Sequence, residues 1–441
     1  MPCGATQDGQ VMVERSDRMW FTGETESGPA TNNAKNVVIL EQNSTFMHRC
    51  GLYIHIPFCK SRCIYCDFYS TTCGGDIRLA YVEAVCKEMS LRREYLDQPV
   101  LSSVYIGGGT PSVLTPEELN TLFATVAEHW QLSPDAEVTL EANPDDVTPD
   151  YAKALAALPI NRVSMGVQTF NDDMLRFLHR RHTAQQARQA VGSLLAADIN
   201  NISIDLIYGL PNQTLDLWQS DLERALALPV THLSAYSLTY EEGTPLFLLR
   251  EQGKVRETDE DLSLQMYSLL MEKAEAAGFH HYEISNFALP GYEARHNSGY
   301  WSGMHYLGLG PAAHSYNGNS RQWNSPDLQA YIKAAGDVFV ANLFSREELS
   351  PKMREEETLL TRLRTAGGLD LAAFARDFGT KEYDALLARA KPYINNGQLA
   401  IVNRQQTTVN GQWSMVNGQC LSLTRKGLFV SDDIISSLFE D

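Results

Sequence analysis

Short apolar runs alternate with longer stretches in which hydrophobic residues recur every three to four positions, and this alternation begins at residue 51. The apolar runs predict buried strands, and the longer stretches predict amphipathic helices. The six predicted strands, together with the turns that follow them, are GLYIHI (51–56), VYIGGGTPS (104–112), VTLEANP (138–144), RVSMGVQTF (162–170), NISIDLIYGLP (201–211) and THLSAYSLTYEEGTP (231–245). Helices are expected over 76–96, from the N-cap residue Thr115, over 171–197, at about 214–227 and over 258–278.

Repeated strand–helix units predict parallel strands joined by right-handed crossovers. Because there are six units rather than the eight of a closed barrel, the expected fold class is α/β, an incomplete (β/α)6 TIM-type barrel. Folds of this kind place their ligands at the carboxyl ends of the strands. Polar residues at those ends are therefore the first candidates for a site.

The polarity of the chain changes along its length and predicts four regions. The stretch before the first strand is polar and aperiodic, which is typical of a flexible extension. Residues 283–325 hold many aromatics, glycines and histidines and are expected to be a loop-rich stretch. The regions are the extension (1–48), the partial barrel (49–285), a linking region (286–345) and a small α+β, winged-helix-like C-terminal domain (346–441).

The chain has 441 residues, of which 44% are hydrophobic and 20% are charged, and its net charge is −18 at pH 7. The acidic balance argues against a protein that holds nucleic acid or an anionic membrane through positive charge. No apolar run approaches the length of a membrane-spanning helix, and the first 20 residues resemble neither a secretory signal nor a transit peptide. A cytoplasmic protein is expected.

Three of the eight cysteines, Cys59, Cys63 and Cys66, form the spacing C-x3-C-x2-C. Clustered thiolates suit a soft metal or an iron–sulfur cluster. Structural zinc usually has four closed ligands, so three cysteines fit a [4Fe–4S] cluster with one open iron better. The alternative is a zinc loop that His55 or Cys73 completes.

Polar residues follow several predicted strands in the order that a ligand site requires. The run from Gly107 to Thr110 can let the backbone approach a bound molecule closely. A zwitterionic nucleotide such as S-adenosylmethionine also needs charged and polar partners, and Glu141, Gln168, Arg180 and Asp205 supply them. Singly each could be a helix cap or a surface group; together, behind the cysteine loop, they indicate a site.

The segment YIHIPFCKSRCIYCDF (53–68) resembles the radical S-adenosylmethionine signature. GGGTPS, EANP, GVQTF and DLIYGLP resemble motifs of the oxygen-independent coproporphyrinogen III oxidase-like branch of that superfamily. The resemblance covers roughly residues 50–441, including the C-terminal domain.

This resemblance implies that Cys59, Cys63 and Cys66 ligate a [4Fe–4S] cluster and that Tyr65 shields it. In the family, the reduced cluster passes one electron to the sulfonium, and a 5′-deoxyadenosyl radical forms. Cleavage of the nucleotide and a purely structural role for it both stay open. The positions that match nucleotide contacts are Tyr53, Gly108, Gly109, Thr110, Glu141, Gln168, Arg180, Asp205 and Ala235.

Two features separate this chain from the oxidase. The oxidase has a further cysteine two residues after the third ligand, where this chain has Phe68, and its substrate-related N-terminal arm has no counterpart in residues 1–48. The segment 296–301 matches the H-N-x-x-Y-W motif of a heme chaperone subgroup. The resemblance implies heme contacts at His296, Asn297, Tyr300 and Trp301, since imidazole ligates heme iron and aromatic rings can line a porphyrin face.

The function expected from the resemblance is delivery of heme to acceptor hemoproteins, with respiratory membrane cytochromes among them; a homodimer is left open. The competing hypothesis is an oxygen-independent coproporphyrinogen III dehydrogenase in porphyrin biosynthesis. A third, an iron–sulfur RNA-modifying enzyme, is disfavoured by the acidic charge. A structural alternative also stands, in which His296 and Trp301 are hydrogen-bonded core residues beneath a loop.

Overall fold

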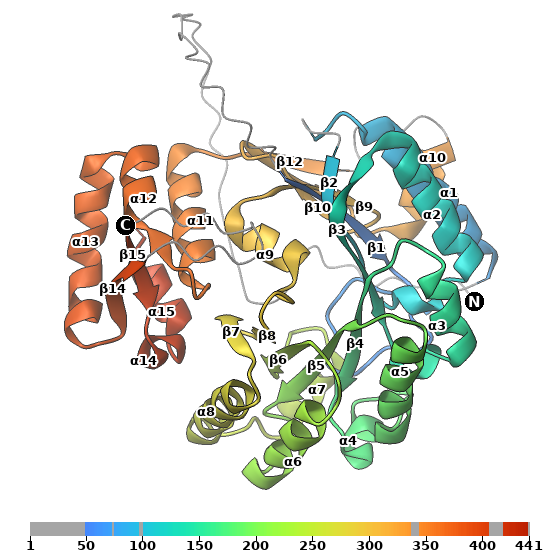
Figure 1. Cartoon of the computed structure of the whole chain (residues 1–441), viewed down its shortest axis with the longest axis horizontal. Coiled ribbons are helices and arrows are strands. Elements are labelled where there is room, and N and C mark those ends of the chain that lie inside the picture. Colours follow the sequence, from blue (N-terminus) through green and yellow to red (C-terminus); the bar gives the residue numbers. More distant parts are fainter. Residues whose placement is uncertain (1–48, 73–74, 97–99, 337–343, 405–417, 440–441) are drawn as a thin grey trace, which may run out of the picture.

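The computed structural model describes residues 49–72, 75–96, 100–336, 344–404 and 418–439. Six strands each pair in parallel with the next, and helices cover the outside of the curved sheet that they form (Figure 1). The strands are β1 (Cys50–Ile56), β2 (Val100–Gly108), β3 (Gln131–Ala142), β4 (Arg162–Gln168), β5 (Asn201–Tyr208) and β6 (His232–Ser237). This confirms the predicted strands and the α/β partial-barrel fold.

The covering helices follow the strands in chain order. They are α1 (Asp76–Arg92), α2 (Pro116–His129), α3 (Pro149–Ala156), α4 (Asp172–Phe177), α5 (Ala184–Ala196), α6 (Leu215–Leu226) and α8 (Glu260–Ala276), with the short turns η1 (Pro111–Val113) and η2 (Pro144–Asp146). Thr115 caps α2 in a full capping box with Glu118, as its sequence predicts. A further helix, α7 (Pro245–Glu251), lies in the connection that follows β6.

The single helix expected over 171–197 is wrong, because the chain breaks between α4 and α5. His179 has a positive φ of 59°, and Thr183 begins α5 with a capping box to Gln186. Both features end one helix and start another. The break contains Arg180, so this local stop signal decides where a candidate site residue lies.

The large sheet extends beyond the six parallel strands at both edges. Its order is β12-β11-β10-β9-β1-β2-β3-β4-β5-β6-β8-β7, so the barrel stays open between β12 and β7. Strand β9 joins β1 in parallel, whereas β10, β11 and β12 pair antiparallel. The added elements are β7 (His280–Glu283), β8 (Asn286–Ala288), α9 (Arg295–Ser302), β9 (His305–Leu309), β10 (His314–Tyr316), β11 (Ser320–Asn324), α10 (Leu328–Gly336) and β12 (Phe344–Glu348).

The stretch 283–325, expected to be loop-rich, thus contains short strands and one helix joined by loops. Strands of three to five residues are too short to show a clear period along the sequence, and they form here because the edge of β1 offers unpaired backbone groups. The expected domain limit at 345 falls inside β12, which belongs to the large sheet. The four-region division stays a proposal.

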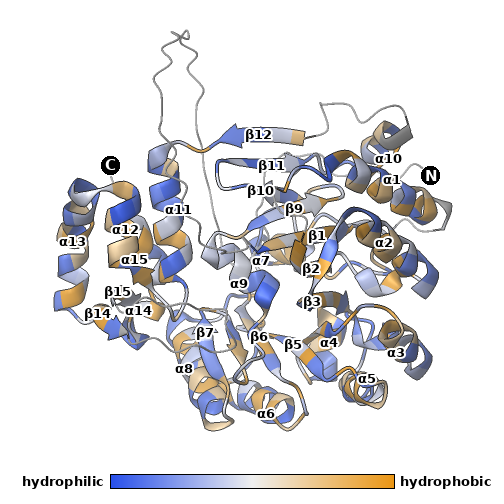
Figure 2. Cartoon of the chain, turned by 45° about the horizontal axis from the view of Figure 1, so that its top comes forward, coloured by the Kyte–Doolittle hydropathy of each residue, from blue (hydrophilic) through white to orange (hydrophobic). Residues whose placement is uncertain are grey.

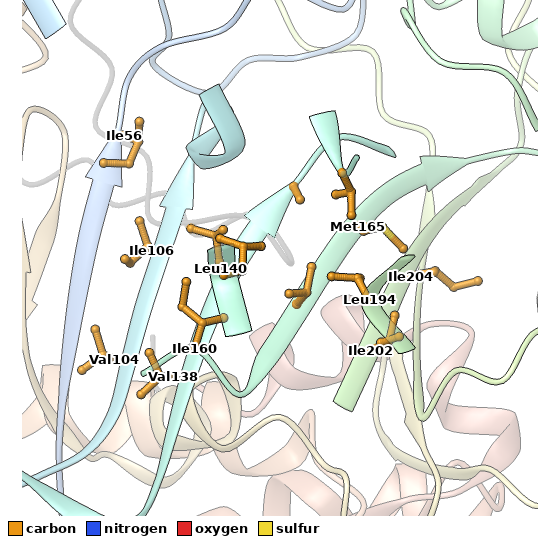
Figure 3. Close-up of a cluster of buried hydrophobic side chains, with 14 of the residues drawn as sticks. Ile56, Val104, Ile106, Val138, Leu140, Ile160, Met165, Leu194, Ile202 and Ile204 are labelled. Atoms are coloured by element: carbon orange, nitrogen blue, oxygen red, sulfur yellow. The ribbon is translucent and has the colours of Figure 1, made fainter. Parts of the chain in front are cut away.

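Alternating side chains give the parallel strands one apolar and one polar face. Val163 and Met165 of β4 join the core between sheet and helices, whereas Arg162 and Ser164 line the cavity on the opposite face. Figure 3 shows the core side chains that β1 to β5 direct to that layer. The period of two thus separates the hydrophobic core from the candidate site.

The C-terminal elements form a separate group beside the large sheet (Figure 2). Their core of Leu359, Phe374, Leu386 and Leu421, with further apolar residues, is distinct from that of the barrel. The elements are α11 (Pro351–Leu363), β13 (Leu369–Asp370), α12 (Leu371–Phe378), α13 (Thr380–Asn395), β14 (Leu399–Arg404), β15 (Gly418–Leu423), α14 (Arg425–Leu428) and α15 (Ser431–Ser437), with sheet order β13-β15-β14. This confirms the small α+β domain. Within the described ranges, no helix has the length and apolar character needed to cross a membrane.

Candidate cofactor and ligand site

One large cavity follows the carboxyl ends of the parallel strands and continues past α9 to α11. Its volume of about 3060 Å³ exceeds the 300–1,000 Å³ of a typical ligand pocket, so it has room for more than one ligand. It is lined by all but one of the predicted site residues: Tyr53, Cys59, Cys63, Tyr65, Cys66, Gly108, Gly109, Thr110, Glu141, Gln168, Arg180, Asp205, His296, Asn297, Tyr300 and Trp301. The tertiary structure brings these scattered positions to one space.

Ala235 is the exception. Its side chain is buried in the core layer between the sheet and the helices, because its neighbours Ser234 and Tyr236 point to the cavity. Its backbone N–H donates to Ser285 O over 2.8 Å. The structure therefore does not bring the Ala235 side chain to the candidate site.

Backbone hydrogen bonds fix the cysteine loop at several points. Cys59 N donates to Thr71 O over 2.8 Å. Ile64 N donates to Leu178 O over 3.3 Å, and Ile64 O accepts from Leu246 N over 2.9 Å. The loop is thus held between the α4–α5 break and the start of α7.

Two polar side chains and one glycine surround the sulfurs. Thr110 Oγ1 donates to Cys59 Sγ over 3.4 Å, and Arg180 Nη1 donates to Cys63 Sγ over 3.3 Å. A Cβ on Gly109 would lie 2.9 Å from the carbonyl oxygens of Ile56 and Phe58 and 3.1 Å from Cys59 Sγ. Only glycine fits this close approach between the loop and β2.

The chemistry of the three thiols fits a bound metal cluster. Burial raises the pKa of Cys59, and burial together with the neighbouring Cys63 raises the pKa of Cys66 to about 12. Thiolates in such surroundings need a metal to stabilise them. Among the described residues, no group of three His, Cys, Asp or Glu side chains, the three cysteines included, is already placed to hold one metal ion.

The zinc alternative loses one of its proposed fourth ligands. His55 is buried, with Nδ1 3.0 Å from Tyr53 OH and Nε2 2.9 Å from Tyr69 O. Burial lowers its pKa to about 4. Both ring nitrogens have protein partners, and Cys73, the other proposed ligand, lies outside the described residues.

Glu141 is held at the end of β3 by its neighbours on β2. Tyr105 OH donates to Glu141 Oε1 over 2.6 Å, and Gly108 N donates to Oε2 over 3.0 Å. Gly108 has a φ of 111°, and a Cβ there would lie 2.6 Å from the His55 ring. Its conformation therefore requires glycine.

Arg180 and Gln168 form the next part of the wall. Arg180 Nη2 donates to Asn143 Oδ1 over 2.6 Å, and its buried Nε has no hydrogen-bond partner among the described residues. Gln168 has a positive φ of 68°, which is uncommon for a residue with a side chain. Gly166 leaves room for both, because a Cβ there would lie 2.7 Å from Gln168 Nε2.

Asp205 lies deeper in the cavity on β5. Burial raises its pKa to about 6, while hydrogen bonds from Ser234 and Ser164 oppose that shift. Its carboxylate is therefore held where a ligand hydroxyl could be recognised.

Sequence reasoning missed several contributors to this wall. Three residues that position predicted site residues are Tyr105, Asn143 and Gly166. Each stands in the same sequence motif as a predicted site residue. Their roles depend on contacts between strands, which the order of residues along the chain does not show. Only their closeness to the motifs could have pointed to them.

His296 is 1% exposed and belongs to helix α9 rather than lying beneath a loop. Its Nδ1 lies 2.8 Å from Ser103 Oγ, and its Nε2 lies 2.9 Å from Tyr300 OH. Burial, with a contribution from Arg162, lowers its pKa to about 3. These contacts agree with the alternative of a hydrogen-bonded core histidine.

Trp301 differs from His296 in its hydrogen bonding. It is 9% exposed, and its buried Nε1 has no hydrogen-bond partner among the described residues. A buried indole N–H without a partner is costly, so it leaves a donor for a bound molecule in the cavity.

Comparison with known proteins agrees with this geometry. Residues 53–225 match the radical SAM superfamily, and residues 349–430 match the HemN C-terminal domain. The heme chaperone HemW of Lactococcus lactis is 38% identical over 326 residues, which make up 74% of this chain and 84% of that protein. HemW of Bacillus subtilis is 37% identical over 74% of this chain and 86% of its own length.

A solved structure shares the fold. Coproporphyrinogen III oxidase (HemN) from Escherichia coli, a radical SAM enzyme, matches with a TM-score of 0.73 at 21% identity, over 89% of this chain and 90% of that chain. Taken with the matches over both domains, the sequence and the fold show that the chain belongs to the radical SAM superfamily and, in its coproporphyrinogen III oxidase-like branch, to the HemW group.

Proposed function

We propose that this protein is a heme chaperone, which binds heme in the cavity beside a [4Fe–4S] cluster and S-adenosylmethionine and transfers it to acceptor hemoproteins. The observation that carries the proposal is that the cysteine loop and the residues of the H-N-x-x-Y-W motif line one continuous cavity. The identity to curated heme chaperones supports it. The acceptors are inferred to include respiratory membrane cytochromes, the site of action is the cytoplasm, and a homodimer belongs to the same proposal.

On the cluster side, Cys59, Cys63 and Cys66 would ligate the irons. When bound, the cluster supplies one-electron reducing chemistry to S-adenosylmethionine. Glu141 and Arg180 offer opposite charges for the amino and carboxylate groups of the nucleotide, and Asp205 offers a carboxylate for its ribose. Tyr65 would exclude water, since it packs against Ile64 and Leu178 at the loop.

On the heme side, Tyr300 and Trp301 would line the porphyrin face and His296 would supply the axial nitrogen. For His296 to bind iron, Nε2 must give up its hydrogen bond to Tyr300 OH. We therefore expect the Tyr300 hydroxyl to release Nε2 when heme enters, while its ring stays in the wall and Ser103 keeps Nδ1 in place.

The test is anaerobic reconstitution followed by separate titrations with S-adenosylmethionine and hemin, observed by electron paramagnetic resonance and visible absorption. Wild type should bind both. The His296→Ala variant should bind hemin more weakly while it keeps its iron and sulfide, because the two sites lie on different segments. A Soret spectrum identical to that of wild type would exclude His296 as a heme ligand. Tyr300, His305 and His314 would then be the remaining candidates.

Two further measurements could overturn the proposal. Cys63→Ala should lose the brown cluster absorbance, since two thiolates cannot hold the cluster firmly; unchanged iron and sulfide would contradict the ligand assignment. The reconstituted protein should form no protoporphyrinogen from coproporphyrinogen III without oxygen. Robust formation would instead establish the dehydrogenase.

A further inference from the structure

A row of aromatic rings leads away from His296 toward the C-terminal domain. The ring centroids of His296 and Tyr300 are 5.0 Å apart, those of Tyr300 and Tyr306 are 4.7 Å apart, and those of Tyr306 and Tyr316 are 6.2 Å apart. Tyr300, Tyr306 and Tyr316 all line the cavity. This tyrosine row gives the cavity one extended wall on which a flat apolar molecule can rest.

The row ends among three arginines. Tyr316 of β10 lies directly opposite Arg321 of β11. Burial and the neighbouring Glu357 raise the pKa of Tyr316, while the cations of Arg321, Arg354 and Arg362 each lower it. Arg354 and Arg362 both belong to α11, and both line the cavity. Arg354 and Arg362 thus bring positive charge to this end of the row, beside the Arg321–Glu357 ion pair, in a chain whose net charge is −18.

Arg321 is neutralised within the protein, because Nη2 lies 2.8 Å from Glu357 Oε1. Arg362 is not. Its Nη2 donates to Ser302 O over 2.8 Å, and among the described residues it forms no ion pair. Arg362 is half-buried, and this burial lowers the pKa of its guanidinium. Arg354 likewise forms no ion pair within the described part of the chain and is exposed in the cavity wall.

The two carboxylates whose charge acts on Arg362 have other hydrogen-bond or ion-pair partners. Asp370 accepts hydrogen bonds from the backbone N–H groups of Ala372 and Ala373 at the start of α12. Asp377 pairs with Arg376, with 2.9 Å between Arg376 Nε and Asp377 Oδ1. A partly desolvated guanidinium without a carboxylate is costly, so its presence in a ligand cavity indicates an anionic ligand group.

We propose that Arg362 and Arg354 bind the propionate carboxylates of the heme, whose macrocycle lies along the tyrosine row. This inference rests on the proposed heme chaperone function and adds the carboxylate-binding residues to it. It also assigns a role to the C-terminal domain, since α11 supplies the charges while α9, β9 and β10 supply the aromatic wall. Guanidinium groups suit the task because they bind carboxylates with two parallel hydrogen bonds.

The test compares hemin with hemin dimethyl ester, in which both propionates are esterified and uncharged. Each ligand is titrated into cluster-reconstituted wild type, Arg362→Gln, Arg354→Gln and the control Arg425→Gln, whose arginine is paired with Glu272, both residues lying outside the cavity lining. Arg362→Gln should weaken hemin binding about tenfold or more, as expected for loss of a charge-assisted hydrogen bond. Its affinity for the ester should change less than about twofold.

An equal loss for hemin and the ester, or no loss for either arginine variant, would overturn the inference. Circular dichroism and iron content show whether a variant is folded. Arg354→Gln provides a second readout, because Arg354 is exposed whereas Arg362 is half-buried. Failure of wild type itself to bind hemin would overturn the proposed function. Hemin binding with no preference over the ester would overturn only the assignment of the arginines.

Discussion

Gly109 shows how one residue determines whether the cysteine loop can approach the sheet. Its N–H donates to Ile56 O over 2.8 Å, and the carbonyl oxygens of Ile56 and Phe58 leave no space for a side chain. The sequence marks this position only as one glycine of a GGG run. Only the tertiary structure shows that, of the three glycines, Gly109 is the one that contacts the cysteine loop.

We predict that Gly109→Ala reduces the retained cluster. Its Cβ would push the loop away from β2 and displace Cys59 Sγ, at a cost of about 1–3 kcal/mol for overpacking. Iron and sulfide per chain after anaerobic reconstitution measure the effect, with far-ultraviolet circular dichroism as the check on folding. The control is Gly192→Ala, since nothing lies within 4 Å of a Cβ there. Iron content like that of wild type in Gly109→Ala would refute the crowding argument.

At the scale of elements, α7 and the α4–α5 break act together on the cysteine loop. The N–H of Ile64 donates to Leu178 O at the α4–α5 break, and its carbonyl oxygen accepts from Leu246 N of α7. Leu246 of α7 is fully buried beside Ile64 and Tyr240. The sequence predicted neither contact, because both join segments more than a hundred residues apart.

We predict that Leu246→Ala loosens this attachment. Removing a fully buried leucine side chain costs about 2–5 kcal/mol, and here the cost falls on the packing that supports the loop. The cluster should therefore be lost faster in air, as followed by the decay of its visible absorbance. Leu248→Ala is the matched control, because Leu248 is 54% exposed on the same helix. Equal decay in both variants would show that α7 does not stabilise the loop.

At the scale of the whole molecule, the buried histidines couple folding to pH. Burial lowers the pKa of His55 to about 4 and the pKa of His182 and His296 to about 3. In the unfolded chain these groups bind protons near pH 6.5, whereas in the fold they stay neutral. The stabilising contribution of these histidines to the free energy of unfolding is therefore fully present above about pH 6.5. It is lost as the pH decreases from there toward the folded pKa values. Asp205 acts in the opposite direction, since its pKa is raised to about 6.

We predict that the cluster-free protein loses stability between pH 7.5 and 5.5, by about 1.4 kcal/mol for each such histidine. Urea unfolding at the two pH values measures the loss. His182→Gln should reduce it by about that amount, because its imidazole no longer resists protonation in the fold. The exposed His280 provides the matched control as His280→Gln. A pH dependence unchanged by His182→Gln would contradict the burial argument.

The sequence by itself determined the six parallel strands, the partial barrel, the C-terminal α+β domain and the cysteine spacing, because periodicity and short motifs are local properties of the chain. Only the tertiary structure decided that β9 to β12 join the large sheet, that His296 is buried with both nitrogens engaged, and that Arg354 and Arg362 of α11 line the same cavity as the tyrosine row. These features arise from pairing and desolvation between distant segments. The free energies of pairing and desolvation depend on which groups come into contact in the folded protein, and the order of residues along the chain does not show those contacts.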